Sequence, residues 1–132
     1  MPYDSNIEDG LGPGRKLFLS GIAFPEDRNG ERFDVNLVTP TGDTALHLSF
    51  RLDEKAIVRN SKLGGEWGSE EREGKLPLQK NRSFELGIGN ETDSYQVYVN
   101  GQKFCSFAQR TEPHVLTLRI DGAIELTGIL VK

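Results

Sequence analysis

Strict alternation of apolar and polar side chains marks the stretch Leu46-His-Leu-Ser-Phe-Arg-Leu52. A period of two residues predicts a half-buried β-strand, because successive side chains of a strand point to opposite faces of the sheet. The four apolar residues are expected to face a core. The other three, His47, Ser49 and Arg51, are expected to form a polar row on the opposite face, about 6.6–7 Å apart along the strand.

The same period recurs along the chain, which favours strands throughout. The segment Arg32-Phe-Asp-Val-Asn-Leu-Val38 alternates as strictly, with Phe33, Val35 and Leu37 expected on one face. No window of ten or more residues has the apolar stripe of a helix. Further strands are expected at residues 15–24, 56–60, 83–88, 95–99, 103–107, 115–120 and 124–131.

Two dipeptides indicate how neighbouring strands connect. Asn100-Gly101 lies between two apolar runs and is a strong signal for a two-residue hairpin, and Asp121-Gly122 repeats the signal between the last two strands. About nine or ten short strands with tight turns predict an antiparallel sandwich or barrel, of which a one-domain sandwich is favoured. Residues 1–10 are expected to form a loose arm or to pair along a sheet edge.

Composition and charge bound the class of protein. The chain has 132 residues, enough for one domain, and its 36% hydrophobic and 27% charged residues are typical of a soluble globular domain. The net charge of −4 argues against nucleic-acid binding, and no apolar run reaches the roughly 18–20 residues that cross a bilayer. No membrane insertion is therefore expected.

The cysteine and histidine content argues against metal and disulfide scaffolds. Cys105 is the one cysteine, so neither an internal disulfide nor a zinc cluster is expected, and His47 and His114 are the only histidines. A lone cysteine fits a reducing compartment, and the acidic start of the chain is unlike a secretory signal peptide. The sequence therefore predicts a cytoplasmic location.

The only tryptophan lies in an unusual setting for a core residue. Trp67 is surrounded by glycines and charges in the segment Lys62-Leu-Gly-Gly-Glu-Trp-Gly-Ser-Glu-Glu-Arg-Glu73. An indole at the surface offers a flat apolar platform with polar groups beside it, which suits the apolar face of a sugar ring. Glu70 and Arg72 are placed to form a charge pair that could also hold hydroxyl groups. The alternative interpretation is an ordinary charged hairpin.

Three motifs in order resemble those of the galectins, a family of sugar-binding proteins. They are His47-x-Ser49-x-Arg51, Val58-x-Asn60 and Trp67-x-x-Glu70-x-Arg72. The resemblance implies a jelly-roll sandwich of two antiparallel sheets, related to that of the legume lectins, and a single carbohydrate-recognition domain over residues 1–132. It also implies that β-galactosides bind in a shallow groove on the concave sheet, without a metal or other cofactor.

The resemblance implies a role for each matching residue. His47 and Arg51 would bind the axial 4-hydroxyl of galactose, and Arg51 would also reach the ring oxygen. Asn60 would hold the 6-hydroxyl, and Trp67 would stack on the apolar face of the ring. Glucose carries its 4-hydroxyl equatorially and would leave polar groups of the protein unpaired, which is costly.

Two departures from the family pattern bear on specificity. Ser49 stands where most galectins have Asn, and its shorter hydroxyl is expected to lose direct contact with the 4-hydroxyl or to reach it through water. The stretch from Arg51 to Asn60 is also shorter than in vertebrate prototype members, as in some invertebrate ones. Asp53 or Glu54, at the tip of this loop, is hypothesised to face the ligand.

Glu70 has an expected role at the neighbouring sugar. By the same resemblance, it would bind a hydroxyl there while paired with Arg51 and Arg72. These arginine partners also argue against a glycosidase, which needs a carboxyl group that stays protonated as general acid. No enzymatic activity is expected.

Two further matters follow from the resemblance. The expected partners are galactose-terminated glycans of glycoproteins or glycolipids, and a homodimer through the terminal strands is compatible with the alternating segment 124–131. Galectins reach the cell exterior by non-classical secretion, so an extracellular location is also compatible. The alternative function is a galectin-fold structural or protein-interaction module whose sugar binding is altered or lost.

Overall fold

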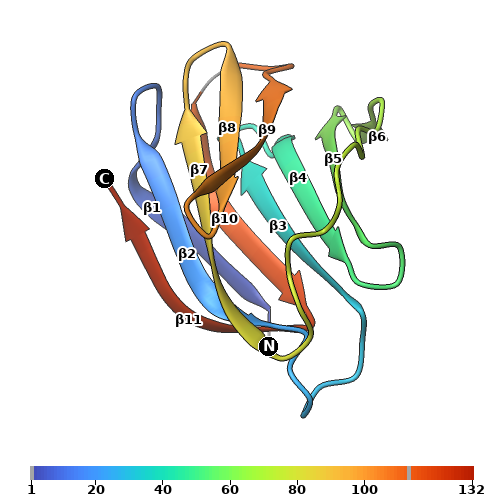
Figure 1. The fold of residues 1–132 in the computed structure, drawn as a ribbon. Helices are drawn as coiled ribbons and strands as arrows, with labels where there is room; N and C mark the ends of the chain where they lie inside the picture. The colour runs from blue at the N-terminus through green and yellow to red at the C-terminus, as the bar shows by residue number, and fades with distance from the viewer. Residues whose placement is uncertain (1, 113) are drawn as a thin grey trace.

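The computed structural model describes residues 2–112 and 114–132, and its two antiparallel sheets confirm the predicted all-β jelly-roll sandwich (Figure 1). In the described residues the six-stranded sheet has the order β1 (Tyr3–Leu11), β10 (Val115–Gly122), β3 (Arg32–Val38), β4 (Thr44–Arg51), β5 (Ala56–Leu63) and β6 (Glu66–Trp67). The five-stranded sheet has the order β11 (Ile124–Val131), β2 (Lys16–Ala23), β7 (Arg82–Asn90), β8 (Ser94–Val99) and β9 (Gln102–Ala108).

The alternation that predicts strands also places their side chains on the expected faces. In β4, Leu46, Leu48 and Phe50 are completely buried, while Leu52 lies just beyond the strand and is half-buried. In the polar row on the other face His47 and Arg51 are half-buried, and Ser49 is buried. The two-residue period therefore identifies the face of each side chain but does not show what covers it.

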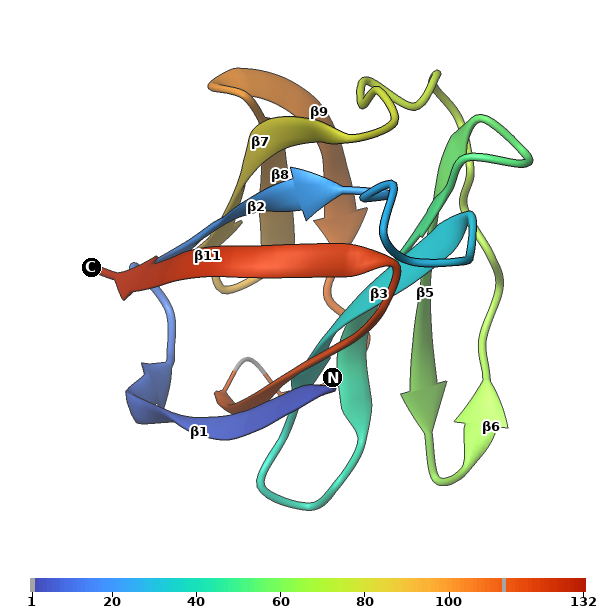
Figure 2. The ribbon, with the colours of Figure 1, turned by 90° about the horizontal axis from the view of Figure 1, so that it is seen from below.

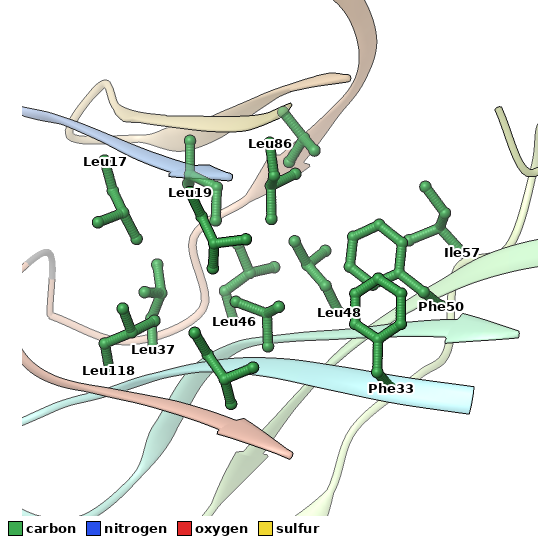
Figure 3. Close-up of a cluster of buried hydrophobic side chains, with 14 of the residues drawn as sticks. Leu17, Leu19, Phe33, Leu37, Leu46, Leu48, Phe50, Ile57, Leu86 and Leu118 are labelled. Atoms are coloured by element: carbon green, nitrogen blue, oxygen red, sulfur yellow. The ribbon is translucent and has the colours of Figure 1, made fainter. Parts of the chain in front are cut away.

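The core lies between the two sheets. Leucine side chains from β2 and β7 point toward leucines and phenylalanines from β3 and β4 (Figure 3). Phe33 and Phe50 are partners across β3 and β4, and their rings stack with centroids 4.4 Å apart and planes 8° apart. This packing fixes the inner faces of β3 and β4, so their outer faces are a firm platform for polar side chains.

The N-terminal segment forms an edge strand. Residues 3–11 form β1, which pairs with β10, and Ile7 and Leu11 are buried in the core. Of the two alternatives for residues 1–10, pairing along a sheet edge is confirmed for residues 3–10, and the loose arm is wrong there. Met1 lies outside the described residues.

One of the two predicted hairpins is confirmed and the other is wrong. Asn100 and Gly101 join β8 to β9, with φ of 51° and 80°, as a type I′ turn requires. At Asp121-Gly122, however, the chain leaves β10 in one sheet and enters β11 in the other, where β11 pairs with β2. The dipeptide marks a crossing between the layers, because the next residues continue the core of the sandwich instead of pairing back on β10.

The strand missing from the sequence interpretation is β6, which has two residues. It pairs with β5 and lies at the edge of its sheet, opposite the edge formed by β1 (Figure 2). Two residues are too few to show alternation. The β5–β6 turn consists of Gly64 and Gly65, whose φ angles of 59° and 82° again suit a tight two-residue hairpin. This turn places Trp67 at the sheet edge, across from Lys62.

Candidate functional site

A hollow of about 460 Å³ lies on the outer face of the six-stranded sheet, over β4, β5 and β6. Its lining contains five of the predicted site residues, His47, Arg51, Asn60, Trp67 and Glu70, together with Val58 and Gly68. Its size suits a small ligand. The three sequence motifs are therefore brought together in one groove, whereas Ser49, Asp53, Glu54 and Arg72 lie outside its lining.

His47 is held as a neutral imidazole. Its Nδ1 is 2.6 Å from Oδ1 of Asn36 on the neighbouring strand, and Oδ1 can only accept, so Nδ1 carries the proton. Burial lowers the pKa of His47 below its usual value; the Asp34 carboxylate opposes this shift and the Arg51 guanidinium adds to it. Nε2 is then left as an acceptor on a residue that lines the hollow. Asn36 belongs to none of the three motifs, although the alternation of β3 places it on the outer face with His47 as its cross-strand partner.

Arg51 is fixed from two directions. Its Nε donates to the Ser49 hydroxyl at 3.1 Å, and its Nη1 forms an ion pair with Oε1 of Glu54 at 3.2 Å. Ser49 is only 3% exposed. The Ser49 hydroxyl therefore helps to fix the orientation of the Arg51 guanidinium. Among the described residues, the ion pair of Arg51 is with Glu54, so the expected Arg51–Glu70 pair is wrong in this structure.

The short loop after β4 is a junction of charges. Glu54 pairs with three arginines: Arg32 at 2.7 Å, Arg51 at 3.2 Å and Arg72 at 3.0 Å. The hydrogen bond from Arg51, followed by that from Arg72, lowers the pKa of Glu54. Glu54 therefore adjoins the groove through Arg51, as the loop hypothesis allows, although its carboxylate is occupied by the protein's own cations.

Asp53, which precedes Glu54 in the same loop, pairs with Arg32 of β3. Its carboxylate forms an ion pair with Arg32 at 2.9 Å, and the hydrogen bond from Arg32 lowers the pKa of Asp53. Asp53 is thus placed beside the loop junction and outside the hollow.

Glu70 and Arg72 form the expected pair at 3.0 Å.

Trp67 is the exposed platform of the groove. Its side chain is 54% exposed, and the edge of the His47 ring meets it with centroids 4.7 Å apart and planes 61° apart. The ammonium group of Lys62 lies 5.3 Å from the indole centroid. The ring is therefore steadied on two sides and remains available for stacking.

Asn60 is almost buried and strongly constrained. Its Oδ1 accepts from the Ser61 N–H at 2.8 Å and from Nη1 of Arg110 at 3.0 Å. Its Nδ2 donates to the Gly68 carbonyl at 3.0 Å. Sequence reasoning missed Arg110, which lies 50 residues further along the chain and has no local pattern that reveals this contact.

A second arginine missed from the sequence holds the segment that follows Trp67. Arg59 is 3% exposed, and its Nη1 donates to the carbonyls of Ile57 at 3.0 Å and Glu73 at 2.8 Å. Its Nη2 pairs with the Glu73 carboxylate at 3.0 Å, and its backbone forms a two-way bridge with Glu71. The segment that carries Glu70 and Arg72 is therefore tied to β5 on the core side.

In residues 2–112 and 114–132, no three His, Cys, Asp or Glu side chains gather as a metal-ligand cluster. Over the same residues, no helix has the length and apolar character needed to span a membrane.

Comparison with known proteins places the chain in a family. The family model for the galactoside-binding lectin domain matches residues 2–131. The chain belongs to this family, the galectins, as its motifs predicted. Two relatives, both described as a 32 kDa beta-galactoside-binding lectin, come from Haemonchus contortus and Caenorhabditis elegans. Each is 44% identical over 133 aligned residues, which cover 100% of this chain and 46% and 47% of the relatives. The chain thus spans about half the length of these curated relatives.

A solved structure supports the same assignment. The crystal structure of Caenorhabditis elegans galectin LEC-6 superposes with a TM-score of 0.91 at 32% identity, covering 100% of this chain and 91% of that one. The likeness includes the arrangement of both sheets, which confirms the fold expected from the motifs.

Proposed function

We propose that this chain is a lectin that binds β-galactosides in the groove over β4, β5 and β6 without a metal ion. The observation that carries the proposal is the convergence of four fixed and different groups on one hollow. They are an acceptor on His47, a cation on Arg51, an amide on Asn60 and an exposed indole on Trp67.

Galactose offers a surface that complements these groups. The axial 4-hydroxyl can donate to Nε2 of His47 and accept from the Arg51 guanidinium, since a hydroxyl does both. The 6-hydroxyl extends toward Asn60, and the apolar face of the ring lies against Trp67. An equatorial 4-hydroxyl, as in glucose, would leave His47 and Arg51 without a ligand partner.

The edge of the groove suits a second sugar. Glu70 lines the hollow and is paired with Arg72 at 3.0 Å, so both can share hydroxyl groups of a neighbouring residue in a glycan. Glu70 is the only carboxylate among the described lining residues. A glycosidase needs two carboxyl groups about 5–9.5 Å apart, so the lining favours binding over hydrolysis.

The affinity for a disaccharide is expected to be modest. One indole stack and a few hydrogen bonds compete with water in an open groove, which corresponds to a Kd of about 10 µM to 1 mM. Tight binding to glycoproteins or glycolipids would then need several sites on one particle.

Calorimetric titration with lactose in EDTA tests the proposal. The wild type should give saturable heat in the stated range, and Trp67→Ala should weaken binding by more than about tenfold, since it removes the stacking platform. Trp67 is exposed, so this variant should keep the wild-type free energy of unfolding. A matched control is Tyr98→Ala, which removes an exposed aromatic side chain (38%) from β8 in the other sheet. No heat with lactose and no binding to any galactoside on a glycan array would contradict the proposal and favour a protein-interaction module. Equal binding by Trp67→Ala would contradict the groove over β4, β5 and β6 as the place where the sugar binds.

A further inference from the structure

Arg110 bonds to the groove residue Asn60 without lining the groove itself. It follows β9, and its side chain is 23% exposed and stacks on Phe107 at 4.5 Å from the ring centroid. Its Nη1 donates to Oδ1 of Asn60 at 3.0 Å and to the Ser61 hydroxyl at 3.1 Å. Its Nη2 donates to the Ser69 carbonyl at 2.8 Å and to Glu71 at 3.1 Å. One guanidinium therefore joins β5 to the segment that follows Trp67.

These contacts decide which end of the Asn60 amide a ligand meets. An amide oxygen has two lone pairs, and both are used by donors from Ser61 and Arg110. The amide nitrogen has two hydrogens, of which one goes to the Gly68 carbonyl. The remaining polar group that Asn60 can offer is one N–H. The Ser61 N–H and the Gly68 carbonyl already set which end of the amide is oxygen, and Arg110 occupies the second lone pair of that oxygen, so that none is left for a ligand.

We propose that Arg110 is a positioning residue that presents Asn60 to the groove as a hydrogen-bond donor. The site consequently selects a ligand with an acceptor oxygen at that place. This inference rests on the proposed function, in which the acceptor is the 6-hydroxyl oxygen of a galactoside. Arg110 itself does not line the hollow, so it acts through Asn60.

Gly68 supplies the space for this arrangement. A Cβ at position 68 would lie 2.8 Å from Nη1 of Arg110 and 3.2 Å from Oδ1 of Asn60. Gly68→Ala would thus push the end of the arginine side chain away while leaving its charge in place. Because the displaced atoms belong to a flexible side chain, the fold should tolerate this change. The variant disturbs the same hydrogen bond as a substitution of Arg110 by a different route.

Two ligands that differ by one oxygen separate positioning from stability. They are methyl β-D-galactopyranoside and its 6-deoxy analogue, which lacks the acceptor for Asn60. The wild type should prefer the 6-hydroxyl ligand by about threefold to tenfold, the range of a single neutral hydrogen bond. In Arg110→Met that preference should fall, because Asn60 loses one of its three hydrogen bonds and its oxygen regains a free lone pair, while affinity for the 6-deoxy ligand stays within about twofold. Arg110→Lys should recover part of the preference, and Gly68→Ala should reduce it.

Arg82→Met is the matched control for charge. It removes one cation from the exposed first residue of β7, in the other sheet, and should keep the wild-type preference. If Arg110→Met weakens both ligands by the same factor, its role is only structural and the inference is overturned. If Arg110→Met keeps the full preference, the inference is also overturned.

A readout that needs no sugar distinguishes this inference from the proposed function. The Asn60 side-chain amide should give two fixed NMR resonances in the wild type, with one hydrogen protected by Gly68, and these should broaden or shift in Arg110→Met. Unchanged amide resonances would overturn the positioning role. A wild type that binds neither ligand would overturn the proposed function alone, with the amide signals still deciding the role of Arg110.

Discussion

At one end of the groove Arg51 is held by an ion pair with the partly exposed Glu54, whereas at the other end Arg110 holds Asn60 and the buried Arg59 holds the segment that follows Trp67. The exposed end is defined as Arg32, Arg51, Asp53, Glu54 and Arg72, and the buried end as His47, Arg59, Asn60 and Arg110. Around Arg51, which is itself 18% exposed, the other side chains of the exposed end are 31–47% exposed, while those of Arg59 and Arg110 are 4% and 23% exposed.

The two ends differ in how much they contribute to the stability of the fold and to the orientation of the groove residues. Ion pairs in water gain little free energy and weaken in salt, so the exposed end should orient Arg51 without adding much stability. Hydrogen bonds from a buried guanidinium to backbone carbonyls leave unsatisfied groups when they are lost, so the buried end should hold up the fold as well as the site. Variants at either end test this difference.

The largest effect is expected at Arg59. Arg59→Met keeps an apolar stem but leaves the carbonyls of Ile57 and Glu73 without this donor. The free energy of unfolding should fall by about 2–4 kcal/mol, as measured by urea denaturation. Arg82→Met, an exposed arginine on the other sheet, should change it by less than about 0.5 kcal/mol. Equal stabilities of the two variants would show that burial at this end does not matter.

The sequence predicted most of the fold because alternation is a local signal. The range of β3 was predicted to the residue, and the inward row of β4 was predicted as well. The two-residue strand β6 is too short to show a period. A dipeptide such as Asp121-Gly122 does not distinguish a hairpin within one sheet from a crossing between two sheets. Where a turn leads is decided by the core that the next strand joins.

The same reasoning explains which parts of the site were predictable. Residues in the three motifs were found because each motif lies within one strand or one short segment. The contact of Arg110 with Asn60 joins positions 50 apart in the chain. Such contacts exist only after the sheets have formed, so no spacing in the sequence reveals them.

Between about pH 6.5 and lower values, a change of pH should titrate His47 at the buried end while the carboxylates of the exposed end keep their charge. The pKa of His47 is lowered in the folded protein, chiefly by burial, so in the unfolded chain it titrates at the higher value of about 6.5. As pH falls below that value the unfolded state takes up the proton first, and stability decreases until the folded pKa is passed. The carboxylates of the exposed end have lowered pKa values and stay ionised through this range.

Binding should follow the same titration. Lactose affinity should be constant from pH 8 to about 6.5 and fall at lower pH, once Nε2 of His47 becomes a donor in place of an acceptor. Calorimetry across this range and NMR titration of the His47 ring would measure both effects. His47→Gln should abolish the pH step in affinity. A His47 midpoint above 6.5, or affinity that rises on acidification, would contradict the neutral imidazole.

The smallest effect is expected at Glu54, which belongs to the exposed end. Glu54→Gln removes the ion pairs with three arginines, yet Arg51 keeps its bond to the Ser49 hydroxyl, so lactose affinity should fall by less than about threefold. Asp53→Asn removes an equal charge whose ion pair is with Arg32, and it should leave affinity unchanged. Titrations in about 0.05 M and 0.5 M NaCl should show the Glu54→Gln difference shrinking in salt, because screening weakens these pairs in the wild type. A loss as large as that of Trp67→Ala would mean that Glu54 contacts the ligand itself, and the exposed end would then be part of the binding surface.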